Sequence, residues 1–268
     1  MRANRLEAAA GLRWIAESFA ILRMAPFWQL LFSLVFVVAL TIVMSVPLIG
    51  FALVWLLIPA LLVGPHAIAR AAARRHVPGV ELLLAGFRSN FAAQLRLGAV
   101  YLGGMLVVVA ATIPADDGRF AQAILGITRL GLDELRAPAL QNAMLIGALV
   151  QTVVLGLLWY APLLVAWQGI AAGKAVFFSV AATFINWRPF VAYGGGMLLL
   201  FALVLMLALA GSSLLGGPGA VQANSAMFAV IWSMLPVWFA GSYLGYRDVF
   251  EAGTDEGREP PKSPTIPA

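Results

Sequence analysis

The chain contains no cysteine, and only two of its 268 residues are histidine. Disulfide bonds, thiolate metal sites and cysteine nucleophiles are therefore excluded, and a metal site built from several histidines cannot be assembled. We expect neither a metal ion nor a cofactor.

Charge is the second scarce feature of the sequence. Only 11% of the residues are charged and 62% are hydrophobic, whereas a soluble domain has roughly 25% charged and about 45–50% apolar residues. This composition predicts an all-α integral membrane protein. The net charge of +5 is spread in short strips between apolar runs and forms no basic soluble face, so nucleic acid is not expected as a partner.

The apolar runs predict a bundle of six transmembrane helices. Four charge-free stretches of the chain provide room for two, one, one and two crossings of about 20 residues each. An amphipathic N-terminal segment (1–25) precedes the membrane domain (26–250), and a Gly- and Pro-rich, disordered cytoplasmic tail (251–268) follows it. The predicted spans cover about residues 26–46, 51–69, 97–115, 140–168, 189–210 and 223–245.

The distribution of basic residues predicts the orientation of these spans. Because the number of spans is even, both termini lie on the same side, together with 14 of the 17 Lys and Arg residues. Only Arg119, Arg129 and Arg136 fall on the other side. The positive-inside rule then places both termini in the cytoplasm, and the overall composition predicts a multi-pass integral membrane protein.

Internal similarity suggests three tandem helix hairpins. At an offset of 177, Trp55, Pro59, Gly64 and Arg70 recur as Trp232, Pro236, Gly241 and Arg247. Two other spans share a Tyr-x-Gly-Gly-Met-Leu pattern that begins at Tyr101 and at Tyr193. Amphipathic segments with basic and aromatic residues precede the odd-numbered spans, which predicts helices that lie in the headgroup layer.

Two sets of residues are candidates for ligand contacts. Basic and aromatic residues near the predicted interfacial segments could contact anionic lipid headgroups, and the prolines of the even-numbered spans could kink helices around a cavity. The first set is Arg88, Arg96, Lys174, Arg188, Trp159 and Trp187, and the second is Pro59, Pro162 and Pro236.

Catalytic motifs are weak in this chain. His66 is the one titratable residue well inside a predicted span, and Ser212 and Ser213 are the serines considered as its partners for intramembrane proteolysis. They are predicted to lie near opposite membrane surfaces, which argues against that activity. Asp116 and Asp117 could bind a cation, but adjacent carboxylates after a proline are more typical of a solvated turn. We therefore predict a protein that is not an enzyme.

Three stretches of the sequence resemble a family of uncharacterised proteobacterial inner-membrane proteins. They are WLLIPALLVGPHAIARAA, YAPLLVAWQGIAAGKAVFFS and FINWRPFVAYGGGM, and the segment Asn186 to Phe190 is the most specific part. The resemblance covers about residues 10–250. It implies a polytopic protein of the bacterial inner membrane without an assigned activity, so it transfers no catalytic residues.

The leading functional hypothesis is non-enzymatic binding or movement of a lipid or another hydrophobic ligand, with membrane lipids as the partners. One alternative is an accessory or assembly protein that binds another membrane protein, or a second copy of itself, through small-residue faces such as Gly241 and Gly245. The other alternative is a small-solute permease or channel whose pore is lined by the three prolines.

Overall fold

The computed structural model describes residues 3–131, 133–216 and 220–251, which form helices joined by short turns and contain no strand. The predicted all-α class is confirmed. Residues 252–268, nearly all of the predicted cytoplasmic tail, lie outside the described residues. The helices are α1 (Ala9–Met24), α2 (Pro26–Met44), α3 (Ile49–Ala73), α4 (Ala85–Arg88), α5 (Phe91–Asp116), α6 (Arg119–Ile124), α7 (Pro138–Leu157), α8 (Ala161–Gln168), α9 (Ala172–Ile185), α10 (Trp187–Gly216) and α11 (Ala220–Tyr246), with short helical turns at Val80–Leu84, Glu134–Arg136 and Arg247–Glu251.

Six stretches of the described chain are apolar and long enough to cross a membrane, which confirms the predicted number. The fourth stretch combines α7 and α8, which are separated by a turn at residues 158–160. The six stretches are Pro26–Met44, Ile49–Ala73, Phe91–Asp116, Pro138–Gln168, Trp187–Ser213 and Ser225–Glu251.

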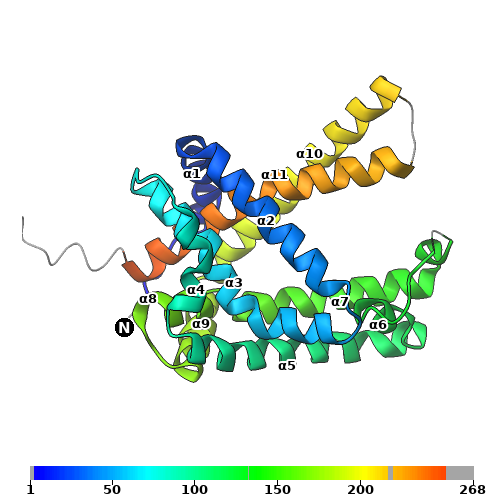
Figure 1. Cartoon of the computed structure of the whole chain (residues 1–268), viewed down its shortest axis with the longest axis horizontal. Coiled ribbons are helices and arrows are strands. Elements are labelled where there is room, and N and C mark those ends of the chain that lie inside the picture. The colour runs from blue at the N-terminus through cyan, green and yellow to red at the C-terminus, as the bar shows by residue number, and fades with distance from the viewer. Residues whose placement is uncertain (1–2, 132, 217–219, 252–268) are drawn as a thin grey trace, which may run out of the picture.

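The helices form a splayed bundle in which two groups diverge from a common end (Figure 1). In one group α5 packs along α3 and α7, and in the other α10 pairs with α11. Helix α2 runs between the groups and contacts α3 and α11. The short helices α4, α8 and α9 gather at the common end, close to the N-terminal segment (Figure 1).

Burial differs sharply between the central and peripheral helices. Helix α3 contacts α1, α2, α5, α8 and α11, and 56% of its most apolar 18-residue stretch is buried inside the protein. The corresponding share for α10 is 11%. Because lipid tails are as apolar as leucine, an exposed apolar helix face carries no penalty in a bilayer. Helix α3 is therefore held by protein contacts, whereas most of α10 faces the bilayer.

Helix α1 packs against α10 and α11 through a face centred on Trp14. The Trp14 indole N–H donates a hydrogen bond of 2.9 Å to the Asp248 carboxylate. The backbone N–H of Asn4 donates to the carbonyl of Val249 at 2.9 Å. Gly11 lies against the Pro189 backbone carbonyl of α10, where a methyl group would overlap this oxygen. The N-terminal segment is thus tied to the last described turns of the chain.

Side chains from neighbouring helices form hydrogen bonds with the backbone groups at the turn between α7 and α8. The Tyr101 hydroxyl donates to the Leu158 carbonyl at 2.8 Å. The Ser179 hydroxyl donates to the Leu157 carbonyl at 2.8 Å and accepts from the Tyr160 N–H at 3.0 Å. An interrupted helix is tolerated at membrane depth only where its freed backbone groups find such partners. This interruption is therefore closed within the protein.

Candidate functional site

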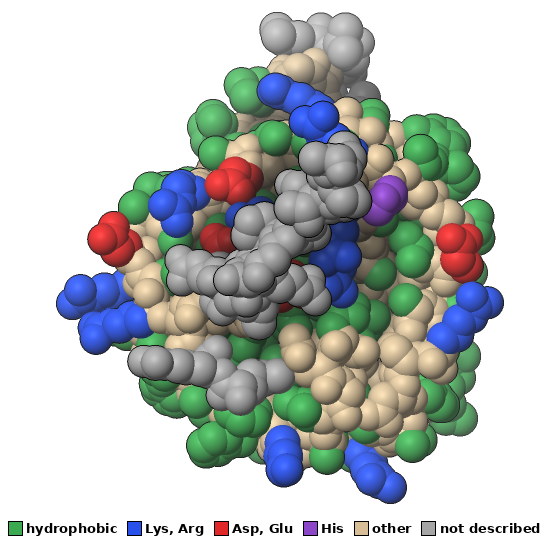
Figure 2. Space-filling model, turned by 90° about the vertical axis from the view of Figure 1, so that its left-hand side faces the viewer, with side chains coloured by type: hydrophobic (Ala, Val, Ile, Leu, Met, Phe, Trp, Pro, Cys, Tyr) green, Lys and Arg blue, Asp and Glu red, His purple; other side chains and the backbone are tan. Residues whose placement is uncertain are grey.

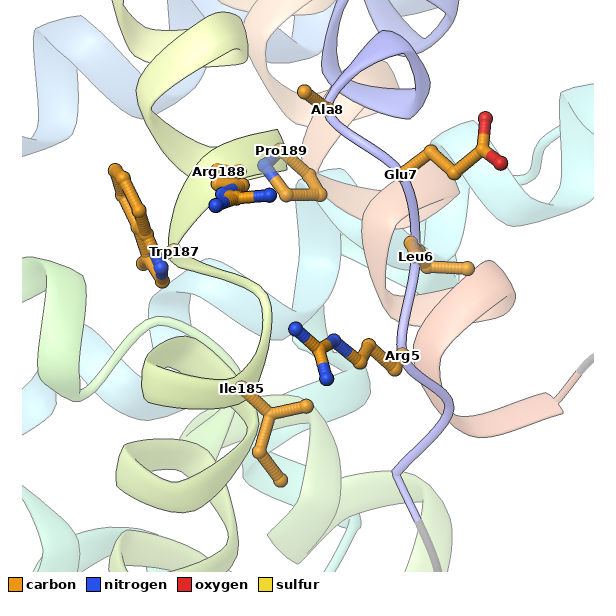
Figure 3. Close-up of a pocket in the computed structure, with 8 residues that line it drawn as sticks. All are labelled: Arg5, Leu6, Glu7, Ala8, Ile185, Trp187, Arg188 and Pro189. Atoms are coloured by element: carbon orange, nitrogen blue, oxygen red, sulfur yellow. The ribbon is translucent and has the colours of Figure 1, made fainter.

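An open pocket with a volume of about 380 Å³ lies where α9 ends and α10 begins. The N-terminal segment forms one wall, and the start of α10 forms the other (Figure 3). We call it the α10 pocket. It is lined by Arg5, Leu6, Glu7, Ala8, Ile185, Trp187, Arg188 and Pro189.

A single buried side chain, Asn186, joins the two walls of the α10 pocket. Its amide nitrogen donates to the carbonyl of Asn4 at 2.9 Å and to that of Ala182 at 3.1 Å. Its amide oxygen accepts from the backbone N–H of Leu6 at 2.8 Å. The residues on either side of Arg5 are therefore fixed to the residue that precedes α10, so contacts within the chain hold both walls of the pocket.

The α10 pocket carries two arginines without counterions. Among the described residues, Arg5 and Arg188 have neither a hydrogen bond nor an ion pair from their guanidinium groups. The two groups face the hollow from opposite walls, while the carboxylate of Glu7 points away (Figure 3). Arg188 also lies over the ring of Trp187, 5.4 Å from its centroid. The pocket can accept an anion with several oxygens, because guanidinium groups bind phosphate in a bidentate manner.

The structure brings only part of the predicted headgroup set together. Trp187, which is 56% exposed, and Arg188 line the α10 pocket. Arg88, Arg96 and Lys174 are exposed elsewhere and do not line it.

The sixth predicted headgroup residue, Trp159, is partly buried and packs against Phe190, Tyr193 and Trp238, with ring centroids 5.1–6.1 Å apart. The sequence reasoning also missed Arg5, whose neighbours are held by a residue about 180 positions away.

The three predicted prolines do not line the α10 pocket. Pro59 and Pro236 are buried inside the continuous helices α3 and α11. Pro162 lies in the first turn of α8, directly after the interruption, so the fourth span breaks instead of bending. The carbonyl of Leu158, one turn earlier, accepts from Tyr101, and the carbonyl of Pro162 itself accepts from Gln94.

His66 has a different serine partner from the one considered in the sequence. Its Nε2 lies 2.9 Å from the hydroxyl of Ser242 on α11. Its Nδ1 lies 2.6 Å from the Leu62 carbonyl, which can only accept, so Nδ1 carries the proton and Ser242 donates to Nε2. Ser212 and Ser213 instead donate within α10. His66 and Ser242 are at most 5% exposed and do not line the α10 pocket, so we interpret them as a helix contact.

The loop opposite the common end forms a self-contained turn. The Asp116 carboxylate accepts hydrogen bonds from the backbone N–H groups of Gly118 and Phe120, and these bonds cap the start of α6. No group of three or more potential metal-ligating side chains occurs among the described residues. Arg119 pairs with Glu134, which also accepts from the Gly131 N–H at 2.7 Å. These hydrogen bonds, the backbone one above all, lower the pKa of Glu134 from its ordinary value.

Gly241 and Gly245 pack against aromatic residues of the same chain. Gly241 lies against the ring of Tyr193, and Gly245 lies against Tyr160 and Trp14. Both glycines are buried in the described structure. In the described structure these two glycines therefore pack α11 onto its own neighbours.

Comparison with known proteins identifies one relative along nearly the whole chain. A probable inner membrane protein of Burkholderia thailandensis is 32% identical over 265 residues, which span 94% of this chain and 96% of the relative. No family model and no solved structure matches the chain. With its six apolar helices, the chain is a multi-pass integral membrane protein and belongs to the family of this inner membrane protein.

Proposed function

We propose that this protein binds anionic phospholipids at the α10 pocket and does so without catalysing a reaction. The observation that supports this proposal most strongly is the pair of unpaired guanidinium groups, Arg5 and Arg188, in one pocket. Both arginines are exposed, so an anionic headgroup can replace water at the two guanidinium groups and accept charge-assisted hydrogen bonds from them. A lipid phosphate supplies the missing negative charge and remains in the headgroup layer.

The surface next to the α10 pocket suits the acyl chains of such a lipid. Val191 and Leu198 follow Arg188 on one stripe of α10 and are 63% and 67% exposed. Gly195 lies between them on the same stripe, and a side chain added there would meet no atom within 4 Å. This apolar, indented stripe leads from the arginine along the helix, so one lipid can place its phosphate in the pocket and its chains against α10.

We further propose that the common end of the bundle faces the cytoplasm. The N-terminal segment and the start of α10 lie at this end (Figure 1), and Lys and Arg side chains are spread around its edge (Figure 2). The charge distribution supports this orientation, because 14 of the 17 basic residues fall on the side of the termini. The α10 pocket then faces the leaflet whose anionic lipids attract basic residues.

The threefold repeat also remains part of the proposal. Two tyrosines that match in the repeat make equivalent hydrogen bonds: Tyr101 donates to the carbonyl of Leu158, and Tyr193 donates to that of Trp238 at 3.0 Å. In each case the acceptor belongs to the next even-numbered span. This similarity supports an origin from repeated hairpins, with a helical segment preceding each odd-numbered span.

The proposal is tested by analysing the lipids that copurify with the protein in polymer nanodiscs. We expect phosphatidylglycerol or cardiolipin to be enriched over the bulk membrane around the wild-type protein. The double variant Arg5→Gln with Arg188→Gln weakens the lipid at the α10 pocket by roughly tenfold, the effect of losing charge-assisted hydrogen bonds, and so lowers this enrichment. Arg88→Gln with Arg96→Gln is the matched control, because it removes the same two positive charges at exposed residues outside the pocket.

The lipid analysis also separates the alternatives. Bulk lipid composition together with a stoichiometric copurifying protein contradicts the proposal and indicates an accessory subunit. Equal loss of enrichment in the Arg88→Gln, Arg96→Gln control and in the Arg5→Gln, Arg188→Gln variant indicates a diffuse charge effect and also contradicts a defined site. Thermal melting of each variant in detergent verifies that the fold is retained.

A further inference from the structure

A second open pocket, with a volume of about 580 Å³, lies where α1 turns into α2 beside the end of α3. Arg75 and His76 are its polar residues, and no acidic residue lines it. We call it the α2 pocket. Its lining is Met24, Ala25, Pro26, Phe27, Trp28, Ala72, Arg75, His76 and Val77.

The two walls of the α2 pocket are held in place by hydrogen bonds. Gln29, which is 4% exposed, donates from its amide nitrogen to the Ile21 carbonyl at 2.8 Å and so ties α2 to α1. On the other wall, Arg75 has a positive φ of 58° and its N–H donates to the Ala72 carbonyl at 2.8 Å. His76 donates from its backbone to the same helix end at 3.0 Å. The backbone that carries Arg75 and His76 is therefore held in a fixed conformation at the end of α3.

The α2 pocket combines an unpaired cation with an exposed apolar rim. The guanidinium of Arg75 has neither an ion pair nor a hydrogen bond to another described residue. Phe27 and Val77 are 67% and 81% exposed. Soluble anions such as inorganic phosphate do not require an apolar rim, whereas a lipid needs one for the glycerol backbone and the start of its acyl chains.

We propose that the α2 pocket is a second, separate site for an anionic phospholipid, with the phosphate at Arg75 and His76 and the chains beside Phe27 and Val77. The inference rests on the proposed function for the class of ligand. A Pro-Phe pair stands at the start of both α2 (Pro26-Phe27) and α10 (Pro189-Phe190), and each pocket lies at one of these two helix starts. The pockets adjoin opposite ends of α1, whose 16 residues span roughly 24 Å. One lipid phosphate cannot serve both.

Native mass spectrometry of delipidated full-length protein, titrated with phosphatidylglycerol, tests this inference. We expect two tightly held lipids in the wild-type protein. Arg75→Gln weakens one of them about tenfold and leaves the other unchanged. The adjacent Arg74→Gln, which is exposed and does not line the pocket, behaves like the wild type. Combining Arg75→Gln with Arg188→Gln weakens both lipids.

Each contrary outcome identifies which proposal fails. If Arg75→Gln binds phosphatidylglycerol as the wild type does while Arg188→Gln loses one lipid, the second site is wrong and the proposed function stands. If neither variant changes binding, both proposals are wrong. If inorganic phosphate displaces the Arg75-dependent lipid as readily as added phosphatidylglycerol does, the pocket is a soluble-anion site and the lipid assignment is overturned. Melting temperatures equal to that of the wild type show that the variants are folded.

Discussion

Two helix interruptions near the common end of the bundle can be compared directly. The turn between α7 and α8 and the junction between α9 and α10 both contain buried polar side chains that bind freed backbone groups. At the first, Ser179 and Tyr101 form hydrogen bonds with the freed backbone groups, and no charged side chain takes part in these bonds. At the second, Asn186 fixes the backbone, but Arg5 and Arg188 remain unpaired around an open pocket.

This difference separates a structural interruption from a candidate binding site. In membrane transporters, interrupted helices often mark substrate sites because their free backbone groups bind the ligand. Here the backbone groups at the α7–α8 turn are already bound within the protein, so that interruption offers a ligand little. The α9–α10 junction instead offers charge. The proposed function therefore rests on unpaired charge and not on a broken helix.

The largest expected effect on stability is at the turn between α7 and α8. Ser179→Ala leaves the Leu157 carbonyl and the Tyr160 N–H without partners in the interior. We expect the free energy of unfolding to fall by about 2–4 kcal/mol, because each unpaired buried group costs about 1–3 kcal/mol. The folded protein keeps its bound phosphatidylglycerol. Denaturant unfolding in detergent measures the first effect and native mass spectrometry the second.

The control for this variant is Ser213→Ala, since Ser213 is exposed and donates only to a carbonyl of its own helix. It should change stability little. The comparison fails if the two serine variants are equally stable, or if Ser179→Ala releases bound lipid from the folded protein.

An intermediate effect on stability is expected at the junction between α9 and α10. Asn186→Ala removes the hydrogen bonds to Asn4, Leu6 and Ala182, which lowers the free energy of unfolding by about 1–2 kcal/mol. It also frees the wall that carries Arg5, so phosphatidylglycerol binding weakens several-fold even though both arginines remain. Hydrogen exchange of residues 3–8 should become faster in the variant.

Asn142→Ala is the matched control for Asn186→Ala, because Asn142 is exposed on α7 and its side chain has no hydrogen bond to another described residue. Unchanged exchange at residues 3–8 in Asn186→Ala would show that the asparagine does not organise the pocket. Faster exchange with unchanged lipid binding would show that Arg188 alone holds the lipid.

The smallest effect is expected at Glu134, in the loop far from both interruptions. Its pKa is lowered in the folded protein by the Gly131 N–H and by Arg119. The stabilisation is therefore fully present above the ordinary pKa of 4.5 and is lost as the pH falls through the lower, folded value. Because Glu134 is exposed, Glu134→Gln should barely change the melting temperature at pH 7. A large decrease, or any loss of bound lipid, would show that charge matters beyond the pockets.

The fold class and the number of spans could be predicted because they depend on composition and run length alone. An apolar run of about 20 residues has few alternatives to a membrane helix. Trp187 and Arg188 could also be proposed, since an aromatic residue beside a basic one at the start of an apolar run is a local pattern.

The remaining features depend on contacts between distant parts of the chain. Nothing near Arg5 in the sequence indicates that Asn186 fixes its neighbours. The partnership of His66 with Ser242 requires α3 to pack along α11, which a pattern within either helix does not specify. The interruption before Pro162 likewise depends on Tyr101 and Ser179, which come from α5 and α9 and compensate the loss of helical hydrogen bonds.

The tie between the N-terminal segment and the last described turns sets an order of assembly. Asn4 binds Val249 and Trp14 binds Asp248, while Asn186 binds the backbone of Asn4 and Leu6. During synthesis, residues 3–8 are therefore made before all of these partners. The wall that carries Arg5 has its full set of contacts only after α11 and the turn that follows it have been made and packed. The α10 pocket thus reaches its described form late in assembly.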